Sequence, residues 1–408
     1  MKRKPSLQVW KFGGASLADA AAVRHAVSLI RAHDGPLVIV ASALAGVTDL
    51  LLDGAKRSVG GDRAAASEVA ATFLRRHRDL AHALVKAKGA RHGLLLALDA
   101  AAREYREIAH AMAALGDLSA RASDTLVARG ERASSALVAA ALLASGRRAE
   151  PVDAAELVAT DGRHGGAAPD LVKTRRRARA LLLSRLRRGV VPVVPGFIGE
   201  APDGSVTTLG RGGSDLTATL LGRVLGAERV VLWKDVPGIL TADPNAVPDA
   251  RLVPQLHRRE AAEVAYFGAK VLHPRALIPL DGSRISLHVR SFLEPDRPGT
   301  EISTRRTLPR YPVKALATIK GQALVTVAGK GLMGVPGVAA RTFGALHAER
   351  LSVSTIFQAS SESSIGFTLP EGEAARAVAA LRRTFKEDIA AGLVDGVTAR
   401  AGVAVLAV

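Results

Sequence analysis

Short apolar segments alternate with long helical segments in the first part of the chain, and this alternation constrains the fold more than any other feature. Residues 63–86 and 170–188 are rich in alanine, leucine and arginine with helical spacing. Nearly continuous apolar, β-branched runs are typical of strands buried on both faces. Four such runs occur: "LQVWKF" (7–12), "GPLVIVAS" (35–42), "GVVPVVPGF" (189–197) and "RVVLWKD" (229–235). The pattern predicts an α/β domain with a mostly parallel sheet sandwiched by helices.

A second, smaller α+β domain is expected after a change in composition. The segment 293–315, "LEPDRPGTEISTRRTLPRYPVKA", is rich in proline and charge and indicates a boundary. The apolar and helical patterns beyond it predict a β-α-β-β-α unit. We therefore expect domains at 1–300 and 313–400. The apolar segment 401–408 is expected to open a second such unit that the chain lacks, unless it pairs with the first unit or with another subunit.

Composition excludes several classes of site. The chain has no cysteine, which rules out disulfides, thiolate metal sites and a cysteine nucleophile. Its 56 lysines and arginines against 38 acidic residues give a net charge of +18, but the basic residues are spread over helical segments and aromatics are only 3%. We therefore expect that the charge reflects anionic small-molecule substrates or merely an arginine-rich proteome, and we expect no nucleic-acid partner. No signal peptide and no membrane-spanning run is recognisable, which predicts a cytoplasmic protein without a membrane partner.

Three glycine-bearing turns follow predicted strands: "KFGGAS" (11–16), "GRGGSD" (210–215) and "KDVPGILTADP" (234–244). In open α/β sheets, ligands bind beyond the carboxyl ends of the strands, where backbone N–H groups can face them. Taken alone, the first turn is a weak signal and the third is most simply a structural loop. Together they favour an anionic ligand with several phosphates, although no G-x-x-x-x-G-K-[ST] loop is present.

A carboxylate and a guanidinium complete the set of candidate residues. Glu131 lies in the helical segment "ARGERASS" (128–135), and Arg211 lies between glycines. A glutamate can hold an amine, and the planar fork of arginine matches a carboxylate. A glutamate on a helix is more often simply solvated, whereas an N-cap interpretation of the "GRGGSD" turn leaves Arg211 unexplained.

The motifs resemble those of the aspartate kinases in the amino acid kinase superfamily over nearly the whole chain. The resemblance is carried by "KFGGAS", "VASALAGVTDLL", "RGERASS", "GFIGEAPDGSVTTLGRGGSD", "DVPGILTADPNAVPDARL" and "YFGAKVLHPRALIPL". The sequence looks most like the kinase portion of bifunctional aspartate kinase–homoserine dehydrogenases. The region after 313 resembles an ACT-type amino-acid-sensing module. The resemblance implies the amino acid kinase fold and phosphorylation of L-aspartate by ATP with Mg²⁺, the first step of lysine, threonine and methionine biosynthesis.

The resemblance also implies residue roles. The amino-acid pocket would comprise Ser42, Thr48, Glu131, Phe197, Arg211 and Ser214. The nucleotide side would comprise Lys11, Gly13, Gly14, Ser16, Gly212, Gly213, Lys234, Asp235, Leu240, Asn245 and Lys270. Lys11, Arg211 and Asp215 would be the catalytic set, with Asp215 orienting the lysines. No protein metal site is expected, and His273 is expected to be structural.

The nucleotide side departs from the family pattern. Ala15 replaces the usual threonine of K-F-G-G-T-S, Lys234 stands where the usual threonine of T-D stands, and Leu240 and Asn245 replace a tyrosine and an arginine. Weak ATP binding, partly offset by Lys234, is one consequence that we consider. A non-catalytic amino-acid sensor is the main alternative, ahead of a sister kinase or a nucleic-acid binder. We also expect a homodimer partly through residues 313–408, with weak or absent inhibition by threonine or lysine.

Overall fold

The computed structural model describes residues 6–268, 271–306, 312–358 and 363–408. The chain divides into two compact units, Met1–Ala315 and Leu316–Val408. The first unit continues past the expected boundary at 300, because Thr300–Ser303 forms a strand, β10, of the main sheet. Within the described residues, no helix is long and apolar enough to cross a membrane.

The first unit is built on an eight-stranded sheet in the order β3-β4-β2-β1-β7-β9-β10-β8. All neighbouring strands are parallel except β9 and β10, so the mostly parallel sheet expected from the sequence is confirmed. A separate hairpin pairs β5 (Ile198–Glu200) with β6 (Val206–Thr208). The sheet strands are β1 (Gln8–Phe12), β2 (Leu37–Ala41), β3 (Ala149–Pro151), β4 (Val191–Pro195), β7 (Arg229–Lys234), β8 (Gln255–His257), β9 (Ser286–Ser291) and β10 (Thr300–Ser303).

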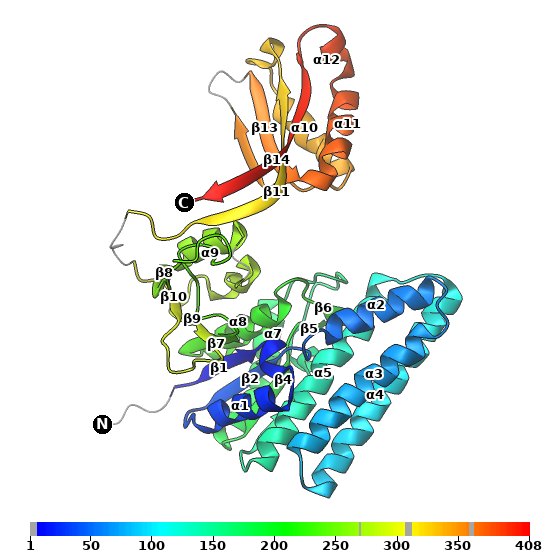
Figure 1. The fold of residues 1–408 in the computed structure, drawn as a ribbon, viewed down its shortest axis with the longest axis vertical. Helices are drawn as coiled ribbons and strands as arrows, with labels where there is room; N and C mark the ends of the chain where they lie inside the picture. The colour runs from blue at the N-terminus through cyan, green and yellow to red at the C-terminus, as the bar shows by residue number, and fades with distance from the viewer. Residues whose placement is uncertain (1–5, 269–270, 307–311, 359–362) are drawn as a thin grey trace. The chain divides into compact units, whose positions relative to one another are not determined.

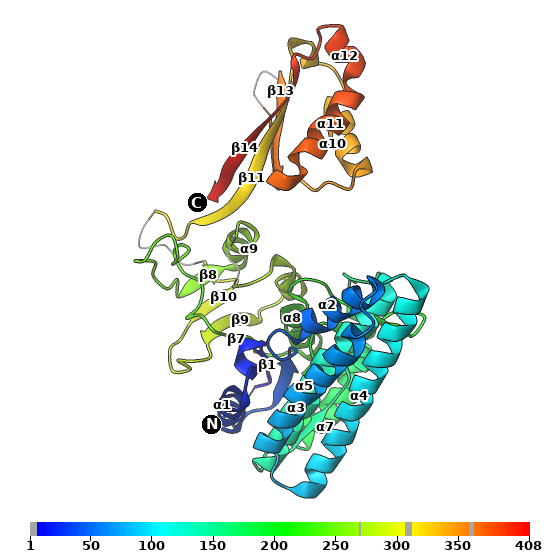
Figure 2. The same cartoon turned by 45° about the vertical axis from the view of Figure 1, so that its right-hand side comes forward.

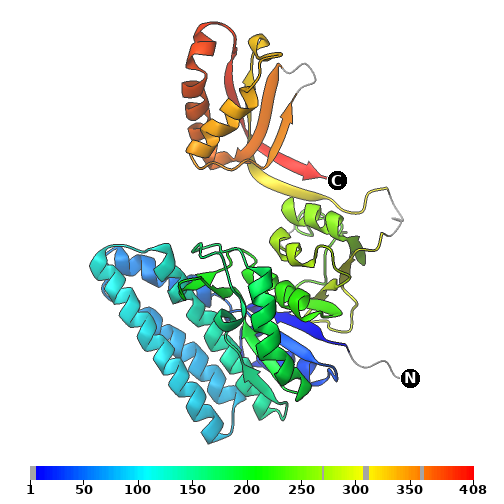
Figure 3. The same ribbon diagram turned by 180° about the vertical axis from the view of Figure 1, so that it is seen from behind.

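Helices cover both faces of this sheet. Figure 1 shows α1 in front of β1 and β2, and Figure 3, seen from behind, shows α7 and α8 on the opposite face. Figure 2 shows α3, α4 and α5 packed side by side as long rods. The helices of this unit are α1 (Ala20–Arg31), α2 (Val47–Val59), α3 (Ala65–Leu84), α4 (Lys88–Leu115), α5 (Ala120–Ala144), α6 (Ala154–Leu157), α7 (Leu171–Arg187), α8 (Gly213–Leu225) and α9 (Arg258–Tyr266).

Side-chain alternation along the central strands explains why the sheet is buried on both faces. Trp10 and Phe12 of β1 pack into the hydrophobic core under α1 to α5. Val9, the residue before Trp10, points to the opposite face and packs into a second core under α6, α7 and α8. Successive side chains of a strand point to opposite faces, so a strand covered on both sides must be apolar throughout. Gln8 and Lys11 are the polar residues of β1, and Lys11 lies next to the carboxyl end of the strand.

The second unit has one four-stranded antiparallel sheet in the order β12-β13-β11-β14. Its elements are β11 (Ala317–Ala328), α10 (Val338–Ala348), β12 (Thr355–Gln358), β13 (Ser364–Pro370), α11 (Ala374–Thr384), α12 (Lys386–Ala390) and β14 (Gly396–Ala407). The predicted β-α-β-β-α order is confirmed. The strand expected from 401 begins earlier, at Gly396, and it pairs with β11 of this same unit from Ala328 to Ala317.

Candidate active site

The candidate residues gather where the central strands end. Lys11 of β1 lies opposite Val40 of β2 and Leu232 of β7, so the loops that follow these three strands leave the sheet side by side. After β1 come Gly13, Gly14 and a short 3-10 turn, Ala15–Leu17. Ligands of open α/β folds bind at such an edge. The topology therefore brings the turns predicted from the sequence to one place.

A buried carboxylate with two ammonium groups forms the centre of this edge. One carboxylate oxygen of Asp215 lies 2.8 Å from Lys11 Nζ, and the other lies 2.7 Å from Lys234 Nζ. Asp215 and Lys11 are 5% and 6% exposed. Two lysines against one aspartate give these three residues a net charge of +1. A buried excess charge is costly unless an anion meets it, so the cluster favours a phosphate ligand.

The pKa values of this cluster follow from its contacts. Burial alone would raise the pKa of Asp215, but the ammonium groups of Lys11 and Lys234 outweigh it and lower that pKa. Burial lowers the pKa of Lys11 despite the attraction of Asp215, and the like charge of Lys234 acts in the same direction as burial. Asp215 is therefore ionised at neutral pH, and it holds both ammonium groups.

The turn after β1 is packed closely against the loop after β2. A Cβ on Gly14 would lie 3.2 Å from the carbonyl oxygen of Ala43, and one on Gly13 would lie 3.4 Å from Lys11 Nζ. Ser16 follows in the 3-10 turn and is buried, with its backbone N–H donating to the Gly13 carbonyl. The glycines thus leave free the space directly around the Lys11 ammonium group.

The turn that carries Arg211 requires glycine for its geometry. Gly210 and Gly212 adopt φ of 71° and 70°, and the Gly213 N–H donates to the Gly210 carbonyl at 2.9 Å. A Cβ on Gly212 would lie 2.4 Å from Cβ of His273. The structural role expected of His273 agrees with this packing, and its Nδ1 also accepts from the N–H of Arg275. Arg211 itself is exposed at the apex of the turn.

Helix α8 begins immediately after this turn, at Gly213, with Ser214 and Asp215 in its first turn. The positive end of its dipole therefore faces the same edge. Beside it, Phe197 is held in the left-handed region at φ 71°, which is unusual for a non-glycine residue. Its N–H donates to Thr217 Oγ1, and its carbonyl accepts from Leu209 N. Such enforced backbone strain is typical of functional sites.

Glu131 lies in the interior of α5 and is the most unusual carboxylate of the site. It is 4% exposed, and Thr48 Oγ1 donates to its Oε1 at 3.4 Å. Its Oε2 is buried without a hydrogen-bond partner among the described residues. Burial raises the pKa of Glu131 to about 7, although hydrogen bonds from the backbone of Glu131 and Ala43, and the contacts with Thr48 and Lys11, act in the opposite direction. A buried carboxylate with an unsatisfied oxygen is a site for a cationic group.

Ser42 connects α5 to the end of β2. Its N–H donates to the Phe12 carbonyl at 3.1 Å, and its own carbonyl accepts from Ser134 Oγ at 2.5 Å. Ser134 is on α5 near Glu131. Thr48 comes from the first turn of α2. The structure therefore brings Ser42, Thr48 and Glu131 together, as the sequence predicts.

The predicted nucleotide residues are only partly assembled. Asp235 is exposed directly after β7. Leu240 forms an isolated bridge with Leu252, and Asn245 is exposed with its side chain donating to Asp243. Within the described ranges, no hydrogen bond or ion pair joins Leu240 or Asn245 to the Lys11–Asp215–Lys234 cluster. Lys270 lies outside the described residues.

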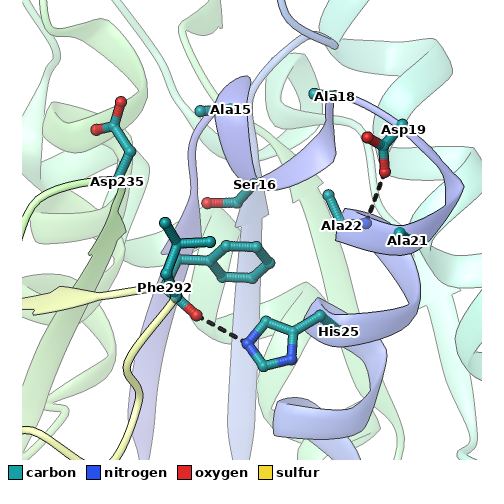
Figure 4. A pocket seen from close by; sticks show the side chains of 10 residues that line it. Ala15, Ser16, Ala18, Asp19, Ala21, Ala22, His25, Asp235 and Phe292 are labelled. Atoms are coloured by element: carbon teal, nitrogen blue, oxygen red, sulfur yellow. Dashed lines mark hydrogen bonds between the residues drawn. The ribbon is translucent and has the colours of Figure 1, made fainter.

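A pocket of about 560 Å³ opens beside these residues on the α1 side. Figure 4 shows Ser16, Asp235, Phe292 and His25 around it, with His25 Nε2 bonded to the Phe292 carbonyl at 2.8 Å. Two of the predicted nucleotide residues, Ser16 and Asp235, thus share one cavity. In the part of the chain that the structure describes, no group of three or more histidine or acidic side chains could hold a metal ion.

Sequence reasoning missed the residues that support the site from behind. Thr217 Oγ1 accepts from Phe197 N and donates to the Gly213 carbonyl, which links two loops far apart in sequence. Arg275 donates to the Leu209 and Ala167 carbonyls, and Asp124 accepts from Thr208. The glycine-rich segment "TDGRHGGAAPD" (160–170), which is typical of a loop, was the available signal.

Comparison with known proteins was made on both sequence and structure. The model of the amino acid kinase family matches residues 6–291, and a model of the ACT domain matches residues 325–385. Lysine-sensitive aspartokinase 3 of Escherichia coli (strain K12) is 35% identical over 361 residues, which is 88% of this chain and 78% of that protein.

Two plant relatives are longer. The chloroplastic aspartokinase 1 of Arabidopsis thaliana is 34% identical over 88% of this chain and 63% of its own length. The chloroplastic bifunctional aspartokinase/homoserine dehydrogenase 1 of Zea mays is 32% identical over 94% of this chain and 42% of its own length. The chain therefore spans less than two thirds of each of these plant proteins.

A solved structure also resembles the whole chain. E. coli aspartokinase III in complex with aspartate and ADP, in its R-state, superposes with a TM-score of 0.81 at 32% identity. The match covers 98% of this chain and 86% of that one. The similarity thus extends over both compact units.

Proposed function

Because this chain belongs to the amino acid kinase family, and within it to the aspartokinases, we propose that it transfers the γ-phosphoryl group of ATP to the β-carboxylate of L-aspartate. The product is 4-phospho-L-aspartate, and the reaction is the first step of lysine, threonine and methionine biosynthesis. The observation that carries this proposal is the buried, unsatisfied carboxylate of Glu131 beside a cluster with excess positive charge. A small substrate with an ammonium group, accepting a phosphoryl group, satisfies both.

On the amino-acid side, Glu131 receives the substrate ammonium, and Arg211 receives a carboxylate through its planar fork. The E. coli structure in complex with aspartate and ADP supports aspartate as the substrate. Arg211 has no hydrogen-bond or ion-pair partner among the described residues, so its guanidinium is available to a ligand. Ser42, Thr48, Phe197 and Ser214 line the remainder of the pocket.

On the phosphoryl side, Lys11 and Lys234 neutralise the charge of the transferring group, and Asp215 holds both ammonium groups in position. Gly13, Gly14 and Ser16 leave room for phosphate oxygens on one side. Gly212 and Gly213, at the positive end of α8, contribute on the other. The substrate carboxylate is ionised at neutral pH, so no general base is required. Catalysis then consists of positioning and charge neutralisation.

Magnesium enters with the nucleotide in this proposal. Mg²⁺ in kinases is bound largely by substrate phosphates with one or two carboxylates and several waters, so the site needs no cage of protein ligands. Asp235, exposed at the end of β7 and sharing a pocket with Ser16, is the carboxylate suited to that role. The bound cation would supply charge neutralisation between the phosphates. Lys270 remains a predicted residue of the ATP side.

The ACT domain points to regulation by an amino acid. We propose that the second unit senses such an effector and that the protein is a homodimer formed partly through this unit. The name of the E. coli relative, lysine-sensitive aspartokinase 3, makes lysine the first effector to test. We further propose that the protein acts in the cytoplasm, as expected from the sequence.

A coupled ADP-release assay with L-aspartate, L-glutamate or no amino acid tests the proposed function. We expect ADP release that depends on L-aspartate and MgATP. Hydroxylamine trapping of the acyl phosphate provides a direct second readout. Binding of aspartate without ADP release would instead support an amino-acid-binding regulatory protein, which the altered residues Leu240 and Asn245 motivate. ADP release without dependence on aspartate would contradict both.

A further inference from the structure

A buried aspartate joins helix α5, which carries Glu131, to strand β6, which precedes the turn that carries Arg211. Asp124 lies near the start of α5 and is 2% exposed. Its Oδ1 accepts a hydrogen bond from Thr208 Oγ1 at 2.5 Å. Its Oδ2 accepts from the Gly165 N–H at 2.9 Å and lies 3.0 Å from His164 Nδ1. One carboxylate thus ties α5 to β6 and to the glycine-rich loop 161–168.

The loop 161–168 is itself fastened to the turn that carries Arg211. The Ala167 N–H donates to the Thr208 carbonyl at 2.8 Å. Arg275 donates to the Leu209 carbonyl at 2.7 Å and to the Ala167 carbonyl at 3.0 Å. The loop, the end of β6 and the start of the Arg211 turn therefore form one hydrogen-bonded assembly. Asp124 connects this assembly to helix α5 through its hydrogen bonds with Thr208 and Gly165.

The Asp124–Thr208 hydrogen bond lies between the two residues predicted to bind the amino acid, Glu131 and Arg211. Asp124 and Glu131 are on the same helix about two turns, or about 10 Å, apart and on similar faces. Thr208 ends β6, and Arg211 follows in the next turn. We propose that Asp124 is a positioning residue that sets the distance between Glu131 and Arg211, and so the length of amino acid that the pocket accepts. This inference rests on the proposed aspartate kinase function.

A different role for these residues is disfavoured by the hydrogen bonding. Asp124, His164 and Ser205 follow one another in the order of a catalytic triad, with Ser205 Oγ 3.5 Å from His164 Nε2. However, Ser205 donates its single hydroxyl proton to Asp203 Oδ1 at 2.6 Å. It therefore has no proton to give to His164, and nucleophilic activation is not supported. Both carboxylate oxygens of Asp124 are engaged, one by Thr208 and the other by Gly165 and His164, as suits a positioning group.

Substitutions at both ends of the Asp124–Thr208 hydrogen bond test the proposal in the full chain. Thr208→Val removes the donor with little change of shape, and Thr208→Ser restores it. Asp124→Asn weakens the acceptor. Calorimetric binding of L-aspartate and steady-state kinetics with L-aspartate, L-glutamate and MgATP are measured for each. Ser58→Ala is the matched control, since it removes another buried hydrogen bond, to the Gly54 carbonyl, at the far end of α2 from Thr48.

We expect Thr208→Val and Asp124→Asn to weaken aspartate binding at least about tenfold and to lower the preference for aspartate over glutamate, with the KM for ATP changed less than about twofold. Thr208→Ser recovers aspartate binding. The double variant Asp124→Asn/Thr208→Val should bind aspartate no more weakly than the more impaired single variant, because both substitutions act on the same hydrogen bond.

Equal losses for aspartate and ATP, unchanged aspartate affinity in Thr208→Val, or the same loss in Ser58→Ala would overturn the proposal. If Asp124→Asn does not fold, the comparison of Thr208→Val with Thr208→Ser decides alone. Failure of the proposed function has a different signature: the unaltered protein would then neither bind aspartate nor release ADP in its presence.

Discussion

Replacement of Glu131 by glutamine should stabilise the free protein while removing its use of aspartate. The carboxylate is buried with one unsatisfied oxygen, and burial raises its pKa from 4.5 to about 7. A folded-state pKa above the unfolded value means that the stability contributed by the protonated form is fully present below about pH 4.5. That stability is lost as the pH rises through about 7. Glutamine has the same shape and never ionises.

The magnitude follows from the shift of about 2.5 pKa units at 1.36 kcal/mol each. Glu131→Gln should raise the free energy of unfolding by about 3 kcal/mol at pH 8 and by only about 1 kcal/mol at pH 5. The attraction between ionised Glu131 and Lys11 is already contained in this pKa, so it requires no separate allowance. Binding sites often contain charged groups that destabilise the ligand-free fold, so removing such a charge commonly raises the free energy of unfolding.

Urea unfolding of both proteins at pH 5 and pH 8, without ligands, measures this effect. Glu156→Gln, an exposed glutamate on α6, is the control and should change the free energy of unfolding equally at both pH values. The same Glu131→Gln variant should bind MgATP normally and lose aspartate-dependent turnover. A variant that is less stable than the parent at pH 8, or whose stability difference does not depend on pH, would refute the reasoning.

The pKa of Glu131 also predicts that kcat/KM for aspartate falls about tenfold per pH unit below about pH 7, and a flat profile between pH 5 and 7 would contradict it. Arg211→Ala should cost about 2–5 kcal/mol in kcat/KM for aspartate with ATP binding retained, as measured by steady-state kinetics and nucleotide titration. Lys234→Thr should lower turnover and raise the KM for ATP by removing one of two cations on Asp215, whereas the exposed Lys173→Thr should not. Leu240→Tyr combined with Asn245→Arg should lower the KM for ATP, and an unchanged value would show that the nucleotide pocket works differently.

Most of the fold could be predicted from the sequence because its strands are covered on both faces. A strand such as 37–41 must be apolar at every position, so it is recognisable without knowing its neighbours. The end of the first unit was harder to predict. Thr300–Ser303 is short and lies at the sheet's antiparallel margin, where pairing with β9 and not a periodic pattern decides that it is a strand. Likewise, β14 begins at Gly396, before its apolar stretch, because β11 supplies a partner there.

The candidate site was predictable where chemistry is local and unpredictable where it depends on packing. The glycines that flank Arg211 predict a turn, and in the structure Gly210 and Gly212 adopt the left-handed conformation that favours glycine. By contrast, nothing in the sequence near Asp124 indicates that it meets Thr208, since that contact exists only because α5 passes beside the β5–β6 hairpin (Figure 1). The left-handed Phe197 is similarly a product of the surrounding hydrogen bonds and not of its own preference.

The charges of the site explain why both substrates belong to one mechanism. Without ligands, Glu131 bears the cost of a buried, unsatisfied carboxylate, while Lys11 and Lys234 share a single aspartate and leave one positive charge over. Glu131 and Lys11 attract each other electrostatically, but no hydrogen bond or ion pair joins Glu131 to Lys11 or Lys234 among the described residues. In the proposed function, an amino acid would bring an ammonium group to Glu131, and a nucleotide would bring phosphates to Lys11 and Lys234. Each ligand would then remove a cost that folding alone leaves, and the substrate carboxylate would lie between the two, beside the phosphoryl group that it receives.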